Sequence, residues 1–547
     1  MKHSRDVLRS RSLATRTIGP DARSLSRPPS RAAALALLAV ALLAIAPASA
    51  AAKQQRPNIV VVMTDDQTLA SMNEMTMPNV TALTEIGATE FTDAIVTTPV
   101  CCPSRATMLT GQYAHNHGVL ANTPGYADLR GKANTLPVWL RRAGYATAHV
   151  GKYLNRYLSS VEESGKVAPG WDEWHTVLDP PRKYVRYYGY RLAVNGEAKR
   201  VGKRPRDYIT RVINRRAARM IRERVPRRKP LYLQVDHRAP HTEAGVKSRG
   251  PCGGLVPPDP RDALAFNGVP LPRPPSFDED DVSDKPTFVG SLPRLSSDVT
   301  SRIELRYRCA LASLLSVDRG VGRIVSALRR ARELANTAIV FTSDNGFFFG
   351  EHRIPEQKTR PYEEALRVPL LVRVPQRVLG GAAPVPEVAE PVANIDLAPT
   401  VLDLAGATPC RKRSRCRTLD GRSLTGLIRG DGAWPAGRGI LLEFDAGERA
   451  RRAKVCRYQG VRAGGHAYVR HTAIADPVTG LCAPIEEVEH YDLAADPFQL
   501  DNLHPAEPGS QQAGIETELE ARLAQLRDCA GISGRDPAPA GGARHCE

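Results

Sequence analysis

Four short apolar runs, separated by stretches with helical periodicity, constrain the fold of this chain more than any other feature. The runs are Ile59–Met63, Thr147–Val150, Leu231–Val235 and Ala338–Phe341. Runs of this length and composition are typical of buried strands. Helical periodicity is clearest in Leu136–Arg142 and Ile303–Ala331. Strands that alternate with helices predict an α/β fold with a mostly parallel sheet covered by helices on both faces.

Length and local composition predict one large domain followed by a smaller one. The chain has 547 residues, and a single domain usually has roughly 100–200. The helical pattern after Asn394–Thr400 ends near Gly406, and a cysteine-containing segment follows. We therefore expect a main domain over residues 51–406, a C-terminal domain over 407–531, and a tail over 532–547 that is disordered apart from Cys546. The Pro-, Asp- and Ser-rich stretch 250–295 predicts a long surface insertion, which either borders a substrate cleft or is a plain excursion.

The first fifty residues have the layout of a secretory signal peptide. A basic stretch ends at Arg31, the apolar run Ala32–Ala46 follows, and small residues lie at Pro47–Ala50. The run is shorter than the roughly 20 residues that span a bilayer. Residues 1–50 therefore predict a cleaved signal, a secreted protein and no stable membrane span. The alternative is an uncleaved leader that tethers the protein to a membrane.

Cysteine number and spacing agree with an oxidising compartment. The chain has ten cysteines. Their spacing predicts three local disulfides: Cys410–Cys416, Cys456–Cys482 and Cys529–Cys546. The neighbours Cys101 and Cys102 are too close in sequence for an ordinary bridge, so this pair needs a different explanation.

The chain is strongly basic. Its net charge is +18, and it is +12 once the eight basic and two acidic residues of the first fifty are set aside. A basic surface favours polyanionic partners, a class that includes nucleic acid, anionic membranes and sulfated glycans. The Arg-rich stretch Arg215–Lys229 is either a glycan-binding face or a solvated helix surface.

A polar cluster follows each of the four predicted strands. The clusters are Thr64-Asp65-Asp66, Gly151-Lys152, Asp236–His241 and Thr342–Gly346. Since the carboxyl ends of parallel strands meet at one edge of a sheet, we expect these side chains to lie close together. Adjacent aspartates and an Asp-Asn pair supply the oxygen ligands that Ca²⁺ or Mg²⁺ prefers. The alternative is that the aspartates cap a helix and that Asp344-Asn345-Gly346 is a simple turn.

The segment Thr97–Gly111 contains the most specific motif of the chain. Its run Cys101-Cys102-Pro103-Ser104-Arg105, followed by Leu109-Thr110-Gly111, resembles the signature of the formylglycine-dependent type I sulfatases. The resemblance implies an alkaline-phosphatase-like α/β fold with a smaller C-terminal α+β subdomain. It also implies that Cys101 is converted to formylglycine (3-oxoalanine) by a separate maturation enzyme, and that Cys102 fills a variable position. A hydrated aldehyde offers two hydroxyls on one carbon, one for attack on sulfur and one for release of sulfate.

The same resemblance implies roles for the strand-end residues. The implied metal ligands, for Ca²⁺ or alternatively Mg²⁺, are Asp65, Asp66, Cys101, Asp344 and Asn345. The implied catalytic residues are Cys101, Arg105, Lys152, His241 and Lys358. The implied substrate-binding residues are Lys152, His241, Lys358 and His117. Leu154 stands where many arylsulfatases have a histidine, so proton delivery to the leaving group is expected from His241, with His115 and His117 as weaker candidates.

Three sequence runs resemble the N-acetylglucosamine-6-sulfatase and heparan-sulfate sulfatase branch in particular. They are Cys101–Arg105, His115–His117 and Gly151–Asn155. The resemblance implies hydrolysis of a sulfate ester on glucosamine or a glycosaminoglycan, with no nucleic-acid partner. The alternatives are an arylsulfatase, a phosphonate or phosphodiester hydrolase on the same fold, and a non-catalytic protein that binds polyanions.

Overall fold

The computed structural model describes residues 56–157, 166–178, 186–225, 229–243, 252, 254–412, 415–435, 437–448, 455–476, 478–539 and 542–547. All described residues belong to one compact unit, Arg56–Glu547. The predicted signal peptide, with its apolar run Ala32–Ala46, lies outside the described residues. Within the described part of the chain, no helix is both long enough and apolar enough to cross a bilayer.

A mixed sheet forms the centre of the large domain. The described strands have the order β11-β2-β10-β9-β1-β8-β4-β5-β6-β7. Their bounds are β1 Asn58–Asp65, β2 Ala88–Phe91, β4 Ala146–Gly151, β5 Glu173–Leu178, β6 Arg191–Val194, β7 Glu197–Arg200, β8 Leu231–Pro240, β9 Thr337–Ser343, β10 Leu370–Arg373 and β11 Glu387–Val388. The central strands β9, β1, β8, β4 and β5 are parallel, and β10, β6 and β7 pair antiparallel with their neighbours. The four predicted strands are the cores of β1, β4, β8 and β9.

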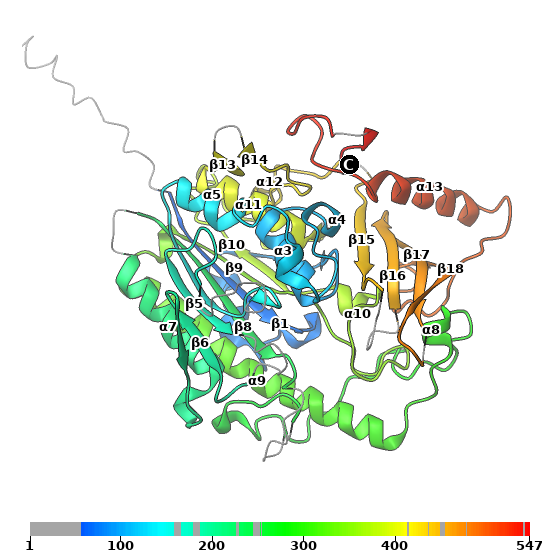
Figure 1. Cartoon of the computed structure of the whole chain (residues 1–547), viewed down its shortest axis with the longest axis horizontal. Coiled ribbons are helices and arrows are strands. Elements are labelled where there is room, and N and C mark those ends of the chain that lie inside the picture. The colour runs from blue at the N-terminus through cyan, green and yellow to red at the C-terminus, as the bar shows by residue number, and fades with distance from the viewer. Residues whose placement is uncertain are drawn as a thin grey trace, which may run out of the picture. The chain divides into compact units, whose positions relative to one another are not determined.

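Both faces of the central strands are buried, which explains their continuous apolar runs. In β1, Ile59 and Val61 belong to one core cluster, whereas Val60 and Val62 belong to another on the opposite face. Helices α3, α5 and α11 cover the first face, and α7 and α9 cover the second (Figure 1). The prediction of a mostly parallel sheet between two helical layers is therefore confirmed.

The described helices begin and end as follows: α2 Pro78–Thr81, α3 Cys101–Thr110, α4 Ala114–His117, α5 Leu136–Arg142, α7 Ile209–Arg224, α8 Thr287–Gly290, α9 Ser297–Arg330, α10 Glu363–Leu366, α11 Leu397–Ala405, α12 Thr425–Arg429 and α13 Gln511–Leu526. The two long amphipathic helices, α7 and α9, pack against each other over β8. Helix α9 begins with a side-chain cap, because Ser296 Oγ accepts a hydrogen bond from the Val299 amide at 3.4 Å.

A separate four-stranded antiparallel sheet lies at the C-terminal end, in agreement with the smaller C-terminal α+β subdomain that the resemblance implies. Its strands are β15 Ile440–Asp445, β16 Val455–Ala463, β17 His466–Ala475 and β18 Cys482–Asp492, paired in chain order. Helix α13 contacts this sheet. Residues before it, such as Leu419 and Leu427, instead pack into the core of the large domain. Ile532, in the predicted tail, is buried against the small sheet's core.

All three predicted local disulfides are present, and a fourth joins Cys252 to Cys309 across 57 residues. This fourth bridge ties the predicted insertion to α9. The insertion also contacts the loop after β9, because the Asp278 amide donates to Gly350 O at 2.9 Å and the His352 amide donates to Ser276 O at 2.7 Å. Two pairs of very short strands, β3 Ala94–Ile95 with β12 Val392–Ala393 and β13 Cys410–Lys412 with β14 Arg415–Cys416, complete the described strands.

Candidate active site

The order of the central strands brings the predicted polar residues to one edge of the sheet. Strands β9, β1, β8 and β4 are consecutive and parallel, so their carboxyl ends lie side by side. Asp344-Asn345 follows β9, Asp65 ends β1 and Asp66 follows it, and Lys152 follows β4. Strand β8 continues five residues beyond its predicted end, to Pro240, so that Asp236 lies within the strand.

Cys101 is the first residue of α3 and lies within this polar edge. Val100 before it is extended, and Pro103 occupies the first turn, where its missing amide costs no helical hydrogen bond. The Cys101 side chain is buried, and its Sγ donates to Asp65 Oδ1 at 3.2 Å. Burial, reinforced by the Asp65 carboxylate, raises the pKa of Cys101 to about 12. An anion at residue 101 would gain about 0.3–1 kcal/mol from the helix dipole.

Two buried lysines neutralise the adjacent aspartates. Lys152 Nζ donates to Asp65 Oδ2 at 2.7 Å, and Lys358 Nζ contacts Asp66 Oδ1 and lies 2.8 Å from Cys101 Sγ. Lys152 reaches this position because Gly151 has φ of +124°, and a Cβ there would come within 1.8 Å of Asp236 O. The residue before Lys152 must therefore be glycine for a steric reason.

Arg105 lies one helical turn beyond Cys101 and is held by two carboxylates. Its Nε donates to Asp344 Oδ2 at 2.7 Å, and its Nη1 lies 3.3 Å from Asp236 Oδ1. The second oxygen of Asp236 accepts hydrogen bonds at 2.9 Å from His149 Nε2 and from Gln234 Nε2. Sequence reasoning placed Asp236 at the correct edge without giving it a role, and it missed His149. The signal that could have identified Asp236 is its position in the strand-end cluster.

His241 lies at the border of the cluster. Its Nε2 is 3.8 Å from Asp66 Oδ2, and its Nδ1 is 2.7 Å from Thr242 O. Because a carbonyl only accepts, Nδ1 carries a proton and Nε2 is the ring atom directed at Asp66. The backbone oxygen of His241 accepts a hydrogen bond from Tyr187 Oη at 2.7 Å, which helps to fix the segment.

The cluster fits a hard divalent cation. Ligand atoms of Asp65, Asp66, Cys101 and His241 lie within 4.8 Å of one another. Asn345 Nδ2 donates to Asp66 Oδ1 at 2.8 Å, and Asn345 Oδ1 is buried without a hydrogen-bond partner among the described residues. A buried amide oxygen beside two carboxylates is the donor set that Ca²⁺ or Mg²⁺ prefers. Burial, with the Asp65 charge, raises the pKa of Asp344 to about 6.

The structure does not bring the two predicted histidines of α4 into this cluster. Both ring nitrogens of His117 have partners inside the protein, Thr107 Oγ1 at 3.0 Å and the Val119 amide at 3.1 Å. His115 Nδ1 lies 3.1 Å from Glu443 and its Nε2 lies 2.9 Å from Cys529 O. His117 is completely buried, so these contacts leave it no access to a substrate. The resemblance had named these residues from their positions in the sequence, which do not reveal the direction of a side chain.

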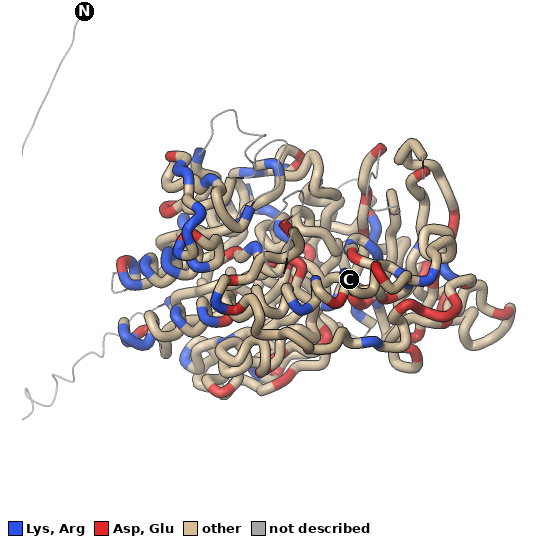
Figure 2. The backbone as a smooth tube through the Cα atoms, turned by 90° about the horizontal axis from the view of Figure 1, so that it is seen from below, with Lys and Arg blue, Asp and Glu red and all other residues tan. Residues whose placement is uncertain are grey.

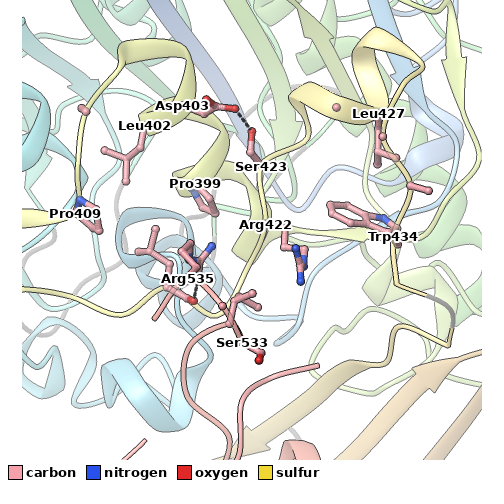
Figure 3. A pocket seen from close by; sticks show the side chains of 17 residues that line it. Pro399, Leu402, Asp403, Pro409, Arg422, Ser423, Leu427, Trp434, Ser533 and Arg535 are labelled. Atoms are coloured by element: carbon pink, nitrogen blue, oxygen red, sulfur yellow. Dashed lines mark hydrogen bonds between the residues drawn. The ribbon is translucent and has the colours of Figure 1, made fainter. Parts of the chain in front are cut away.

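A cavity lies apart from the Cys101 cluster and is not the reaction centre. It measures about 710 Å³ and lies between α11, α12 and the segment around Ile532 (Figure 3). Its lining is mainly apolar, with Trp434, Leu402 and Pro399 among its residues, and Asp403 at its border bonded to Ser423. It includes none of the predicted site residues.

Comparisons with known proteins agree with this arrangement. The sulfatase family model matches residues 57–407, and the model described as N-sulphoglucosamine sulphohydrolase, C-terminal, matches residues 350–529. An arylsulfatase of Volvox carteri is 32% identical over 92% of this chain and 79% of its own. The N-acetylglucosamine-6-sulfatase of Homo sapiens is 30% identical over 89% of this chain and 87% of its own.

A solved structure described as a complex with its substrate D-glucosamine-2-N,6-O-disulfate has the same fold. It superposes with a TM-score of 0.67 at 24% identity and covers 86% of this chain and 97% of that one. The family match extends over well more than half of the chain and includes every strand that carries a site residue. The resemblance inferred from the Cys101 motif is thereby confirmed, and the chain belongs to the sulfatase family of sulfuric ester hydrolases.

Proposed function

We propose that this sulfatase removes sulfate from sulfated glucosamine or a glycosaminoglycan, with formylglycine made from Cys101 as nucleophile and a divalent cation, Ca²⁺ or Mg²⁺. One observation supports this most directly. Residue 101 lies at a helix N-terminus and is enclosed by two aspartates, two lysines and an arginine. With a divalent cation bound, this cluster would accept an anion that reacts at one defined atom.

The positively charged side chains supply electrostatic stabilisation. Lys152 and Lys358 lie beside residue 101 from two sides, so their ammonium groups can hold the oxygens of a sulfate ester in line with the nucleophile. Loss of one such donor typically costs about 2.7–4 kcal/mol of transition-state stabilisation. Arg105 is fixed by Asp344 and Asp236 and therefore orients residue 101 from the next helical turn.

His241 is proposed to deliver the proton that the departing sugar oxygen needs. Its Nδ1–H donates to Thr242 O, so Nε2 is the atom that would take up a proton, form the imidazolium and pass that proton to the departing oxygen. When bound, the cation supplies positive charge that polarises a sulfate oxygen and the nucleophile. Asp65, Asp66, Asp344, Asn345 and residue 101 would hold it. The hydrated aldehyde supplies two hydroxyls on one carbon, one for attack and one for sulfate release.

The substrate class rests on the relatives. The human relative is an N-acetylglucosamine-6-sulfatase, and the structural neighbour binds a disulfated glucosamine. The basic character of the chain agrees with a polyanionic substrate. We also propose that the protein acts outside the cytoplasm, because it has four disulfides.

Peptide mass spectrometry of natively produced protein, combined with sulfate release from glucosamine-6-sulfate, tests this proposal. We expect the peptide with residue 101 to carry an aldehyde in place of CH₂SH. Cys101→Ala should abolish turnover, whereas the matched variant Cys102→Ser should retain it. An unmodified Cys101 thiol in active protein would overturn the mechanism. Faster turnover of a phosphodiester or phosphonate than of any sulfate ester would overturn the assigned substrate.

A further inference from the structure

The positive charge of this protein is concentrated in one segment. Residues 186–225 contain thirteen Lys and Arg against three Asp and Glu, a net charge of +10. This segment forms strand β6, the edge strand β7 and helix α7. Lys and Arg are dense at the end of the molecule that carries α7, and acidic residues are more frequent at the end with the small sheet (Figure 2).

Six of these cations form an exposed surface that we call the basic face. Its members are Arg200, Lys203, Arg204, Arg206, Arg215 and Arg222. Among the described residues, none of the six is within ion-pair distance of an Asp or Glu. Their neighbours Lys199 and Arg219 differ, because they pair with Glu197 at 3.1 Å and with Glu223 at 2.6 Å. The charges of the basic face are therefore not neutralised within this part of the protein.

The elements that carry the basic face are joined to one another. Arg215 Nη2 donates to Arg206 O at 2.8 Å, which links α7 to the short 3₁₀ helix Pro205–Asp207. Arg215 and Arg222 are two helical turns apart on α7, about 10 Å along its axis. The opposite side of α7, with Val212 and Ile213, is buried in the core. Arg206, Arg215 and Arg222 therefore cover a length greater than a single sugar ring.

The basic face leads to the candidate active site. The Ile209 amide, at the start of α7, donates to Tyr187 O at 3.0 Å, and Tyr187 Oη donates to His241 O at 2.7 Å. A Cβ on Gly189 would lie 3.3 Å from Lys203 Cε, so the segment after Tyr187 runs directly beside Lys203. Among the described residues, the segment Tyr187–Gly189 thus connects His241 to Lys203 of the basic face.

We propose that the basic face binds the non-reacting sulfated sugars of a glycan chain while one sulfate ester of that chain lies at residue 101. This inference rests on the proposed function and extends it from a sulfated sugar to a sulfated polymer. Five of the six cations are arginines, whose planar guanidinium groups bind oxyanions through two parallel hydrogen bonds. An anionic chain would neutralise the clustered charges and would bring its sulfates past His241.

Steady-state kinetics with two triple variants tests the proposal. The test variant is Lys203→Gln/Arg206→Gln/Arg215→Gln. The matched control is Arg323→Gln/Arg329→Gln/Arg330→Gln, which removes three exposed charges from the far part of α9. For a heparin oligosaccharide at low salt, we expect KM to rise about tenfold in the test variant and less than about twofold in the control. For glucosamine-6-sulfate, kcat/KM should remain within about twofold of the parent in both.

A heparin affinity column provides a readout that needs no turnover. The test variant should elute at lower salt than the parent and the control, because it lacks three charges that would contact heparin and therefore binds it more weakly. Equal elution of the two variants, or a parallel loss of monosaccharide turnover, would overturn the inference. Equal affinity of the parent for heparin and for double-stranded DNA of the same charge would overturn the glycan assignment. Failure to hydrolyse any sulfate ester would overturn the proposed function, and the column result would still decide the basic face.

Discussion

The variant Asp236→Asn tests the contact that holds Arg105 in place. The Arg105 guanidinium is 3% exposed and lies between Asp344 at 2.7 Å and Asp236 at 3.3 Å. Removing one partner of a buried ion pair costs about 3–5 kcal/mol when the remaining charge is left alone. Asp344 remains here, and Asn keeps the shape of the side chain. We therefore expect the free energy of unfolding to fall by about 2–3 kcal/mol.

The same variant should impair turnover because Arg105 would no longer be fixed beside residue 101. We expect kcat to fall about 10–100-fold, which corresponds to about 1.4–2.7 kcal/mol of activation free energy. KM should change less, since the variant keeps Lys152 and Lys358, the proposed sulfate-binding residues. Urea unfolding and steady-state kinetics on the same preparations measure both effects.

A surface variant provides the control for this prediction. Glu223→Gln breaks the exposed pair with Arg219 and should cost about 0.3–0.5 kcal/mol, with no effect on kcat. In a double-mutant cycle, Asp236→Asn should add little to Arg105→Gln, because both remove the same interaction. Additive effects, or an Asp236→Asn protein as stable and active as Glu223→Gln, would show that Asp236 does not hold Arg105.

Three further variants probe other parts of the molecule. Lys358→Ala should lower kcat about 10²–10³-fold on glucosamine-6-sulfate, and a loss below about threefold would remove Lys358 from the reaction. The Glu443 carboxylate outweighs burial and raises the pKa of His115 to about 9. Protonated His115 therefore stabilises the folded state fully below pH 6.5, and this contribution is lost as the pH rises through about 9. The Tm difference between the parent and His115→Gln should shrink over that pH interval. Cys309→Ser opens the 57-residue loop to Cys252 and should cost about 4 kcal/mol in urea unfolding, whereas an unchanged midpoint would contradict this estimate.

The sequence predicted the centre of the fold better than its edges. Strands buried on both faces, such as β1, can be recognised in the sequence as uninterrupted apolar runs. The edge strand β7 is Glu197–Arg200, which has no such run because it is mostly exposed. Local disulfides could be inferred from spacing, but Cys252 and Cys309 are brought together by tertiary packing alone.

In the candidate site, too, some features could be predicted from the sequence and others could not. The carboxyl ends of parallel strands meet by topology, so the convergence of Asp65, Lys152 and Asp344 followed from the order of elements. The contact partner of an individual side chain could not be predicted in this way. Nothing in the sequence indicates that Arg105 contacts Asp236, or that His117 turns inward toward Thr107. These contacts depend on the directions of the side chains, which are fixed only by packing in the folded structure.

The charges of the site predict which anions it accepts. Among the described residues, the network of direct charge contacts that includes Cys101 joins Asp65, Asp66, Asp236 and Asp344 with Arg105, Lys152 and Lys358. Four carboxylates against three cations leave one net negative charge, which a divalent cation would convert to one net positive charge. A sulfate monoester carries a single negative charge and would make the site neutral, whereas a phosphate monoester at pH 8 carries two and would leave one charge unbalanced in a buried environment. We therefore expect the sugar sulfate to be turned over at least about 100-fold faster than the matching sugar phosphate at pH 8, a ratio equal to about 2.7 kcal/mol. Comparable rates for the two esters would mean that this charge balance does not govern the choice of substrate.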